Sequence, residues 1–352
     1  MRTQHQPIGR LDASDVAYLY RQLAQFESIA RGEINVRADG SRIDANETAF
    51  LQRELLAVDP TQYQELFGAL LGRRYVPLIT GIPEHKMAYS YKMWTVVGKA
   101  KKGTAQGTTD QSFKVTVKEK PSSIVAIPGM IEYTVDEIKA AAAEGVPLEP
   151  MTMIAAHSGL ETVVDTMLAV GDSDIGAEGL LNATGVNSTT PATKTAGGTT
   201  WAVATPAEIL ADIFKMLGEL LDAMSQASAD GGLAPPTFTK FVLLVPVKQH
   251  TLLLKPRSDN SDKSIKAWLL ENLIEHIEAI EPWYKCKGAG AGATDRAVMY
   301  PRNLQALGTV INQEFSTLAA QAVGHKIQIP CQMKCGGVSW KYKVAARYMD
   351  GI

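Results

Sequence analysis

The chain has 352 residues, and its 35 Lys and Arg against 37 Asp and Glu give a formal net charge of -2. This balance, without a long block of one sign, argues against a dedicated nucleic-acid binder. Hydrophobic residues make up 45% of the chain, enough apolar material for the folded cores of roughly two domains. The three cysteines argue against a disulfide framework, and no window approaches the roughly 20 apolar residues of a membrane-spanning helix.

The N-terminal region reads as a helical arm. No apolar core of a signal peptide follows Met1, so we expect a protein that is made in the cytosol and stays soluble there. Apolar residues at helical spacing predict a first helix that ends near Arg31, and a second helix around 50–56 stops at Asp59-Pro60. Such an arm either packs on something outside its own domain or is an ordinary first helix.

Residues 89–97 and 113–120 predict the two strands of an extended hairpin, because both are rich in β-branched and aromatic types with partial alternation. The tip between them holds Lys99, Lys101 and Lys102 but no large apolar side chain, so it cannot bury itself. A lone two-stranded hairpin is marginal in water. Either the hairpin folds onto its own core, or a neighbouring subunit covers its apolar side chains, which are Tyr91, Met93, Trp94 and Phe113.

Two helices are predicted after the hairpin. Thr134 and Glu137 form a capping box before a helix at 135–144, and Gly145 suits its C-terminal end. A longer apolar stripe predicts a helix at 148–169, with Pro150 in its first turn. The chain thus combines long strands with amphipathic helices.

The small polar residues 183–200 predict a surface loop and a domain boundary. Beyond it, an amphipathic helix from Pro206, a buried strand at 238–247, a helix capped by Ser261 or Asp262 and a strand at 297–300 indicate an α/β or α+β domain. The remaining chain is β-rich. We expect a strand at 309–312 and a closing hairpin of 326–333 and 338–345, turning at Cys335-Gly336-Gly337.

No catalytic, cofactor or metal site is predicted. The run Gly288–Ala293 leads into a strand, whereas a dinucleotide fingerprint opens a helix. His157 and Ser158 are adjacent on a helix, so their side chains diverge and form no base-nucleophile pair. Cys331 and Cys335 lack further ligands at zinc spacing. The carboxylates at helical spacing are interpreted as solvated helix faces; they are Glu161 and Asp165, and Glu271, Glu275 and Glu278.

Several segments, taken in order, resemble the tailed-bacteriophage major capsid proteins with the Hong Kong 97 fold, in particular a bacteriophage coat family. The similarity runs from about Phe50 to Ile352, and its order and spacing are more specific than any one motif. The matching segments are Tyr89-Ser-Tyr-Lys92, Tyr133–Ile138, Pro147-Leu148, Gly179–Asn182, Thr294–Tyr300, Ile329–Cys331, Gly336–Val338 and Met349–Ile352.

This resemblance implies an α+β capsid fold with an N-terminal arm, an extended E-loop hairpin, a peripheral domain with a long spine helix, and an axial domain. The C-terminal strands are expected to return to the peripheral domain. The implied domains are the arm at 1–59, the peripheral domain at 60–88, 128–181 and 304–352, the E-loop at 89–127, and the axial domain at 182–303.

The expected function is therefore that of a structural subunit and not of an enzyme. Copies would assemble into hexamers and pentamers of an icosahedral shell around phage double-stranded DNA, bound without sequence specificity. Scaffolding, portal and decoration proteins are possible further partners; assembly is expected in the host cytoplasm, and the finished protein in the virion. The predicted intersubunit contacts are Tyr91, Met93, Trp94, Lys99, Lys101, Lys102 and Phe113.

Two alternatives stay open at this point. An encapsulin-type compartment would share the fold but enclose cargo proteins. A soluble hydrolase or transferase with an unrecognised site would need a deep polar pocket.

Overall fold

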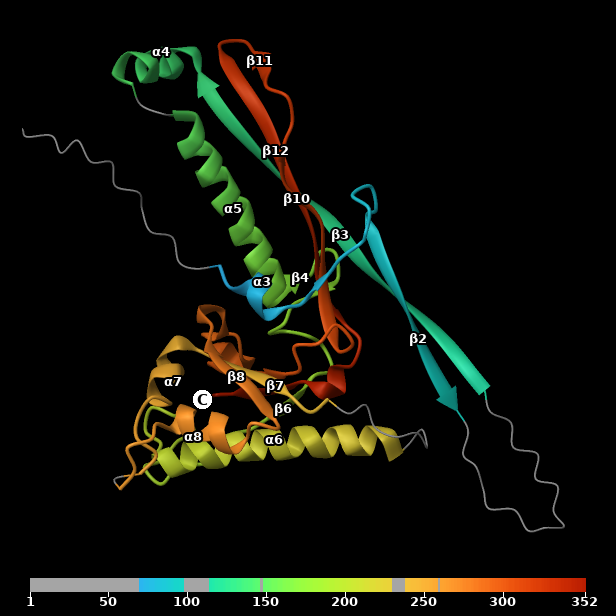
Figure 1. Cartoon of the computed structure of the whole chain (residues 1–352), viewed down its shortest axis with the longest axis vertical. Helices are drawn as coiled ribbons and strands as arrows, with labels where there is room; N and C mark the ends of the chain where they lie inside the picture. Colours follow the sequence, from blue (N-terminus) through green and yellow to red (C-terminus); the bar gives the residue numbers. More distant parts are fainter. Residues whose placement is uncertain (1–69, 98–113, 146–147, 230–237, 259) are drawn as a thin grey trace, which may run out of the picture. The chain divides into compact units, whose positions relative to one another are not determined.

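The computed structural model describes residues 70–97, 114–145, 148–229, 238–258 and 260–352, all within one compact unit, Ala69–Ile352. It confirms a mixed α+β architecture (Figure 1). Within these ranges no helix is long and apolar enough to cross a membrane. The helices expected at 11–31 and 50–56 and the hairpin tip lie outside the described residues, as do Lys99, Lys101, Lys102 and Phe113.

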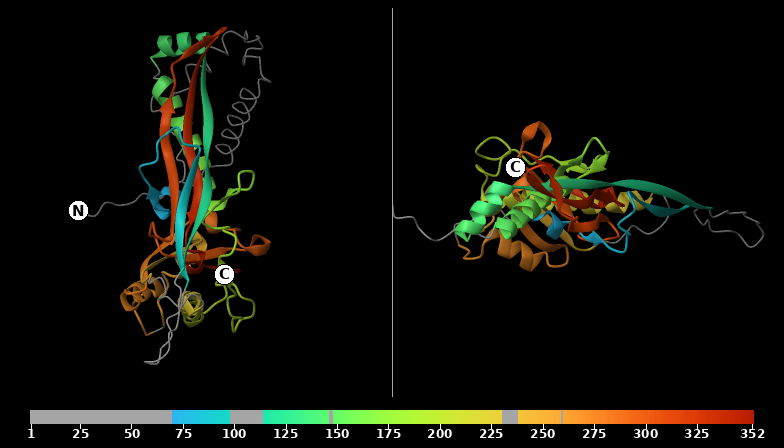
Figure 2. Two further views of the ribbon diagram at one scale, coloured as in Figure 1. Left: turned by 90° about the vertical axis from the view of Figure 1, so that its right-hand side faces the viewer. Right: turned by 90° about the horizontal axis from the view of Figure 1, so that it is seen from above.

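A long sheet forms the first layer, with α5 (Leu148–Val170) packed along one face (Figures 1 and 2). Its strands follow the order β1-β10-β12-β3-β2, with the short strand β11 (Gln321–Val323) beside β12. The bounds are β1 Leu78–Ile79, β10 Leu307–Thr317, β12 Lys326–Trp340, β3 Lys114–Thr134 and β2 Ala88–Val97.

The expected hairpin is confirmed as β2 and β3, which pair antiparallel from Ala88 and Ser123 to Val97 and Lys114. The second strand is much longer than expected. It does not end at 120 but continues to Thr134, and its second half, from Ile124 onward, pairs with β12. One strand therefore links the hairpin to the body of the sheet.

The capping box at the end of β3 is also confirmed. The Thr134 hydroxyl accepts a hydrogen bond from the Glu137 amide (3.2 Å), and the Glu137 carboxylate accepts one from the Thr134 amide (2.8 Å). These bonds start α4 (Val135–Glu144), which ends at Gly145 in the left-handed region (φ 69°). A short helix, α3 (Gly72–Tyr75), lies against α5.

The expected hairpin turn at Cys335-Gly336-Gly337 is wrong, because β12 runs straight through it. Neither glycine has a positive φ. Gly337 instead allows a close approach to the β5 strand: a Cβ there would lie 2.7 Å from the Ala177 Cβ and 2.8 Å from the Glu178 carbonyl oxygen. Strands β4 (Gly171–Asp172) and β5 (Ala177–Glu178) form a small hairpin at this point.

A second sheet has the order β6-β13-β9-β7-β8. The expected buried strand is β7 (Phe241–Val245), in which all five residues are buried. Its apolar run is continuous because alternate residues face two different apolar clusters, one around α5 and one around the helices at Pro206–Ala229 and Ile265–Asn272. The other strands are β6 Asn187–Thr189, β13 Arg347–Asp350, β9 Arg296–Tyr300 and β8 Ile277–Pro282.

Three helices accompany this sheet: α6 (Pro206–Ala229), α7 (Val247–Leu252) and α8 (Ile265–Asn272). The cap of α8 is Ser264, whose hydroxyl accepts from the Ala267 amide, and not the expected Ser261 or Asp262. Short 3-10 turns occur at Tyr284–Cys286, Ala291–Ala293 and Lys343–Ala345.

The last residues of the chain do not follow the expectation that all of 304–352 belongs to the peripheral domain. Strands β10 and β12 join the long sheet, but β13 pairs with β9 and β6 in the second sheet. Long-range contacts hold it there: the Arg296 guanidinium pairs with Asp350 at 2.5 Å and lies 4.3 Å from the centre of the Tyr348 ring. A sequence window near residue 350 carries no sign of these partners.

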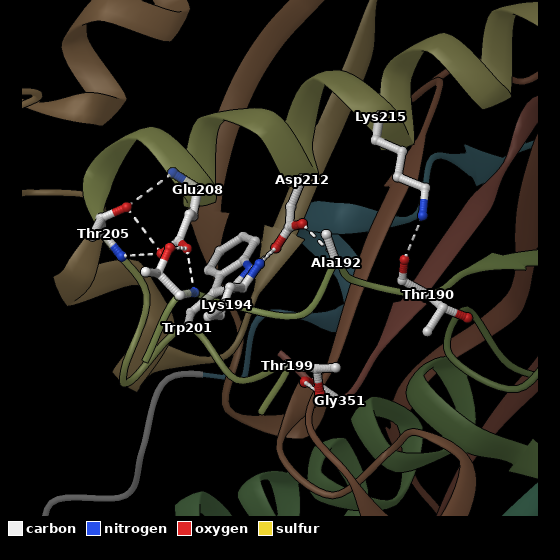
Figure 3. A network of polar contacts seen from close by, with 11 residues as sticks. Thr190, Ala192, Lys194, Thr199, Trp201, Thr205, Glu208, Asp212, Lys215 and Gly351 are labelled. Atoms are coloured by element: carbon white, nitrogen blue, oxygen red, sulfur yellow. Dashed lines mark hydrogen bonds and ion pairs between the residues drawn. The ribbon is translucent and has the colours of Figure 1, made fainter. Parts of the chain in front are cut away.

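The segment 183–200 is also more than a surface loop. It contains β6, and it buries Lys194, whose ammonium pairs with Asp212 of α6 while both side chains are only 1% exposed (Figure 3). The same carboxylate accepts from the Trp201 indole at 2.9 Å and from the Ala192 amide at 3.1 Å. The loop is therefore fixed to α6 by a buried polar network.

Glu208 holds the exposed side of the same loop (Figure 3). Its carboxylate accepts hydrogen bonds from the amides and hydroxyls of Thr205 and Thr195, and these bonds lower its pKa from 4.5 to about 2. A lowered carboxylate pKa adds stability above the unfolded pKa, and this stability is lost as the pH falls through the folded pKa.

We therefore expect Glu208→Gln to make the free energy of unfolding less dependent on pH between 4.5 and about 2. Urea unfolding midpoints across this range would measure the effect. If the urea unfolding midpoints of the wild type and the variant changed equally with pH, the expectation would be contradicted.

Candidate intersubunit surface

The two faces of the hairpin have different surroundings. Side chains of directly opposed residues share a face, so the register places Trp94 with Val117, and Met93 with Lys118. Neighbouring residues of a strand point to opposite faces. The predicted contact residues Tyr91 and Met93 therefore lie on one face, and Trp94 lies on the other.

The face with Tyr91 points toward the body of the same chain. The Tyr91 hydroxyl donates to the Trp340 carbonyl oxygen at 2.6 Å, and the Tyr91 ring stacks on Tyr89 with centroids 6.2 Å apart. Burial raises the pKa of Tyr91. Of the two alternatives for the hairpin, packing on its own body thus applies to this face.

The opposite face carries exposed apolar side chains next to the charged pair of positions Lys92 and Glu119. Trp94 is 73% exposed, and Val115 and Val117 of β3 are also exposed. We call these three residues the hairpin patch. Sequence reasoning singled out Trp94 but missed both valines, although their alternation in 113–120 was visible. The missing information was the register, which sets them on the side of Trp94.

A hollow of about 550 Å³ lies beside β2, at the outer edge of the long sheet. Aromatic residues from both sides line it: Tyr89 and Tyr91 from the hairpin, and Phe238 and Tyr342 from the body, while Trp94 borders it from the other face of β2. The hairpin thus offers both an exposed face and a lined groove.

The carboxylates of α5 correct the expectation of a solvated face. Asp165 is buried and accepts from the Gly72 amide at 2.7 Å and from the Tyr284 hydroxyl at 2.6 Å. Burial and this hydrogen bond raise the pKa of Tyr284. Glu161 pairs with Arg73 at 2.7 Å. Both carboxylates point inward, and their contacts hold α3 and the segment after β8 against α5.

The other carboxylates, Glu271, Glu275 and Glu278, are exposed as expected, but the expected common helix face is wrong, because α8 ends at Asn272 and only Glu271 belongs to it. Glu278 belongs to β8 and pairs with Arg302 at 2.6 Å.

The side chains considered for chemistry make separate structural contacts. His157 packs its ring against Phe315, with centroids 5.2 Å apart, while the Ser158 hydroxyl donates to the Ala155 carbonyl oxygen. All three cysteines are buried thiols. Across the described ranges, no group of three or more His, Cys, Asp or Glu residues could hold a metal ion.

Comparisons with known proteins agree on one family. The family model described as "Major capsid protein" matches residues 98–352. The capsid of Myoviridae phage XM1 is 15% identical, with a TM-score of 0.71 over 85% of this chain and 98% of that one. The capsid of an empty GTA particle is 9% identical (TM-score 0.56, 87% and 97% covered), and a solved structure of Mycobacterium phage Ogopogo is 10% identical (TM-score 0.54, 85% and 98%). No curated protein matches.

Proposed function

Because this chain belongs to the major capsid protein family, we propose that its copies form the hexamers and pentamers of an icosahedral shell enclosing double-stranded DNA. Family membership makes it a structural subunit of a virion capsid and not an enzyme, and subunits of such a shell associate with one another. The fold matches that of tailed-phage capsid proteins.

The domain roles follow from the same premise. The arm is 1–59, the E-loop is 89–127, and α5 is the spine helix of the peripheral domain. The axial domain corresponds to 182–303 together with β13, because β13 pairs with β9 and β6. The remaining segments, at 60–88, 128–181 and 304–346, make up the peripheral domain.

The hairpin patch is the structural observation that supports the proposed self-association. Large apolar side chains grouped on an exposed surface mark interaction sites in soluble proteins. Trp94 faces solvent from a strand whose other face already packs on its own chain. Apolar burial of such an aromatic residue stabilises an interface more than most other contacts. A neighbouring copy covers this patch in the shell, and the tip residues Lys99, Lys101, Lys102 and Phe113 belong to the same contact.

The proposed contents and partners follow from charge and family. A net charge of -2 suits a wall that encloses DNA without binding its sequence. Scaffolding, portal and decoration proteins are further proposed partners, and assembly takes place in the host cytoplasm.

Negative-stain electron microscopy and size-exclusion chromatography of the purified protein test the proposal. Closed shells, or rings of five and six, are the expected result. A uniform monomer near 38.0 kDa, even with crowding agents and candidate scaffolding proteins, would contradict it.

We expect Trp94→Ser to raise the lowest protein concentration that forms shells by about tenfold or more, because it removes the largest apolar contact of the hairpin patch. Its urea unfolding midpoint stays that of the wild type, since the side chain is exposed in the isolated subunit. Val203→Ser, at an exposed apolar position before α6, is the matched control and leaves assembly unchanged. If Trp94→Ser assembled like the wild type, Trp94 would not be part of the interface.

A further inference from the structure

Two adjoining hollows lie where β7 and β8 end. Their volumes are about 400 and 370 Å³, and both are lined by Tyr284 and Lys287. Lys285 borders the first hollow and Lys248 the second. We call the combined feature the lysine-rimmed hollow.

The three lysines of this hollow make no ion pair with a carboxylate of the described part of the chain, so their positive charge is available to a partner. Lys285 only donates to the Thr166 hydroxyl at 2.9 Å and lies 5.3 Å from the centre of the Tyr284 ring. Two carboxylates are close but already engaged. Asp165 is buried, and Asp295 accepts from Gln249 at 2.7 Å and from the Gly288 amide at 3.1 Å.

The walls between the lysines are apolar. Val247 at the start of α7 is 52% exposed, and Val170 and Tyr284 are exposed beside it. A phosphate backbone needs positive charge but gains nothing from exposed apolar walls. An acidic protein surface with an apolar side chain at its centre fits both properties of the hollow.

The same chain carries such a surface at the end of α8. Ile274 is 65% exposed, between Glu271 and Glu275. Glu275 has no hydrogen-bond or ion-pair partner among the described residues, and Glu271 contacts only the exposed Lys263, at 2.5 Å. We call these three residues the acidic knob.

Within one copy, the knob and the hollow are kept apart by the second sheet. Strands β7 and β8 run parallel from the pair Phe241 and Ile277 to the pair Val245 and Pro282. The knob directly precedes β8 in the chain, and the lysines follow β7 and β8. A six-residue strand spans about 20 Å at roughly 3.3 Å per residue, so the two features lie at opposite ends of the strand pair.

We infer that the acidic knob of one copy docks into the lysine-rimmed hollow of a neighbouring copy. The inference rests on the proposed self-assembly and names one of its contacts. Two different surfaces meet in a head-to-tail manner, and such contacts close into rings when the rotation between copies fits. Ile274 enters the apolar walls while Glu271 and Glu275 meet the lysines.

Cysteine crosslinking between copies tests the contact directly. The three native cysteines are buried, so an introduced surface cysteine is the reactive thiol. Ile274→Cys and Val247→Cys are purified separately, mixed and oxidised. We expect disulfide-linked dimers only in the mixture, because each variant alone carries one half of the contact. A disulfide needs Cα atoms within about 7 Å, so the reaction reports proximity.

The matched control replaces Val247→Cys by Leu254→Cys, which is 55% exposed just beyond the same helix. We expect no dimers from the control mixture. Equal dimer yields for Val247→Cys and Leu254→Cys, or none for either, would overturn the inference. If electron microscopy still showed shells in that case, the proposed function would stand without this contact. Absence of any rings or shells would instead reject the proposed function.

Charge reversal gives an independent test. Glu275→Lys and Lys287→Glu each raise the lowest concentration for assembly by about tenfold, and their combination recovers most of the loss because opposite charges again meet. Glu144→Lys, an exposed carboxylate of α4 elsewhere on the chain, has no effect. A double variant that assembles no better than the worse single variant would overturn the pairing. If Lys287→Glu impaired assembly but Glu275→Lys did not, and if the defect disappeared when DNA was removed, the hollow would be a DNA contact and the inference would be overturned.

Discussion

Replacing Asp212 by alanine is expected to lower the free energy of unfolding by about 3–5 kcal/mol, because it leaves the Lys194 ammonium buried without a counter-charge. The side chains of both residues are 1% exposed, so water cannot replace the lost partner. The Trp201 indole and the Ala192 amide lose their acceptor as well. Urea unfolding followed by circular dichroism would measure the loss.

The double variant Lys194→Met with Asp212→Leu separates charge from packing. Replacing both ions by apolar groups of similar size removes the desolvation cost together with the attraction, so it should lose far less than Asp212→Ala. Asp136→Asn on the exposed side of α4 is the control and should change stability by less than about 1 kcal/mol. A double variant as unstable as Asp212→Ala would show that the pair does more than balance charge.

The second large effect is expected for Gly171→Ala, at the start of β4. Gly171 has a φ of 75°, and a Cβ there would meet the Ala177 carbonyl oxygen and lie 2.6 Å from the Gly179 nitrogen. Both are backbone atoms, which cannot rotate away. We expect a loss of about 3 kcal/mol or more in the free energy of unfolding.

Gly176→Ala in the same small hairpin isolates the steric part of this effect. Gly176 also has a positive φ, 65°, but a Cβ there would meet nothing within 4 Å. Its replacement should therefore cost only the left-handed conformation, about 1–2 kcal/mol. Equal losses for the two variants in urea unfolding would contradict the close approach at Gly171.

Local signals in the sequence predicted the elements that depend on neighbouring residues. Thr134 and Glu137 are three positions apart, so the capping box of α4 could be read directly. The continuous apolar run at 238–247 likewise indicated a buried strand, which the structure shows as β7. The capsid family was reached through the order of such segments, and the match to residues 98–352 confirms it.

The misinterpreted features depend on partners far away in the chain. Gly337 suggested a turn, but its lack of a side chain serves the approach of Ala177, about which its sequence neighbours say nothing. Asp165 looked solvated because the amide and hydroxyl that it accepts from belong to Gly72 and Tyr284. The hairpin patch needed the register of β2 against β3, which alternation within either strand does not supply.

The continuity of β3 has a mechanical consequence. Its first half pairs with β2 and its second half with β12, and at roughly 3.3 Å per residue its 21 residues span about 70 Å. A pull on the hairpin along this axis would act on the eleven residue pairs from Ile124 to Thr134 in shear, so that they resist together rather than peeling apart one by one. The same strand ends at the Thr134 cap, so tension on the hairpin is transmitted to the first turn of α4 without an intervening hinge.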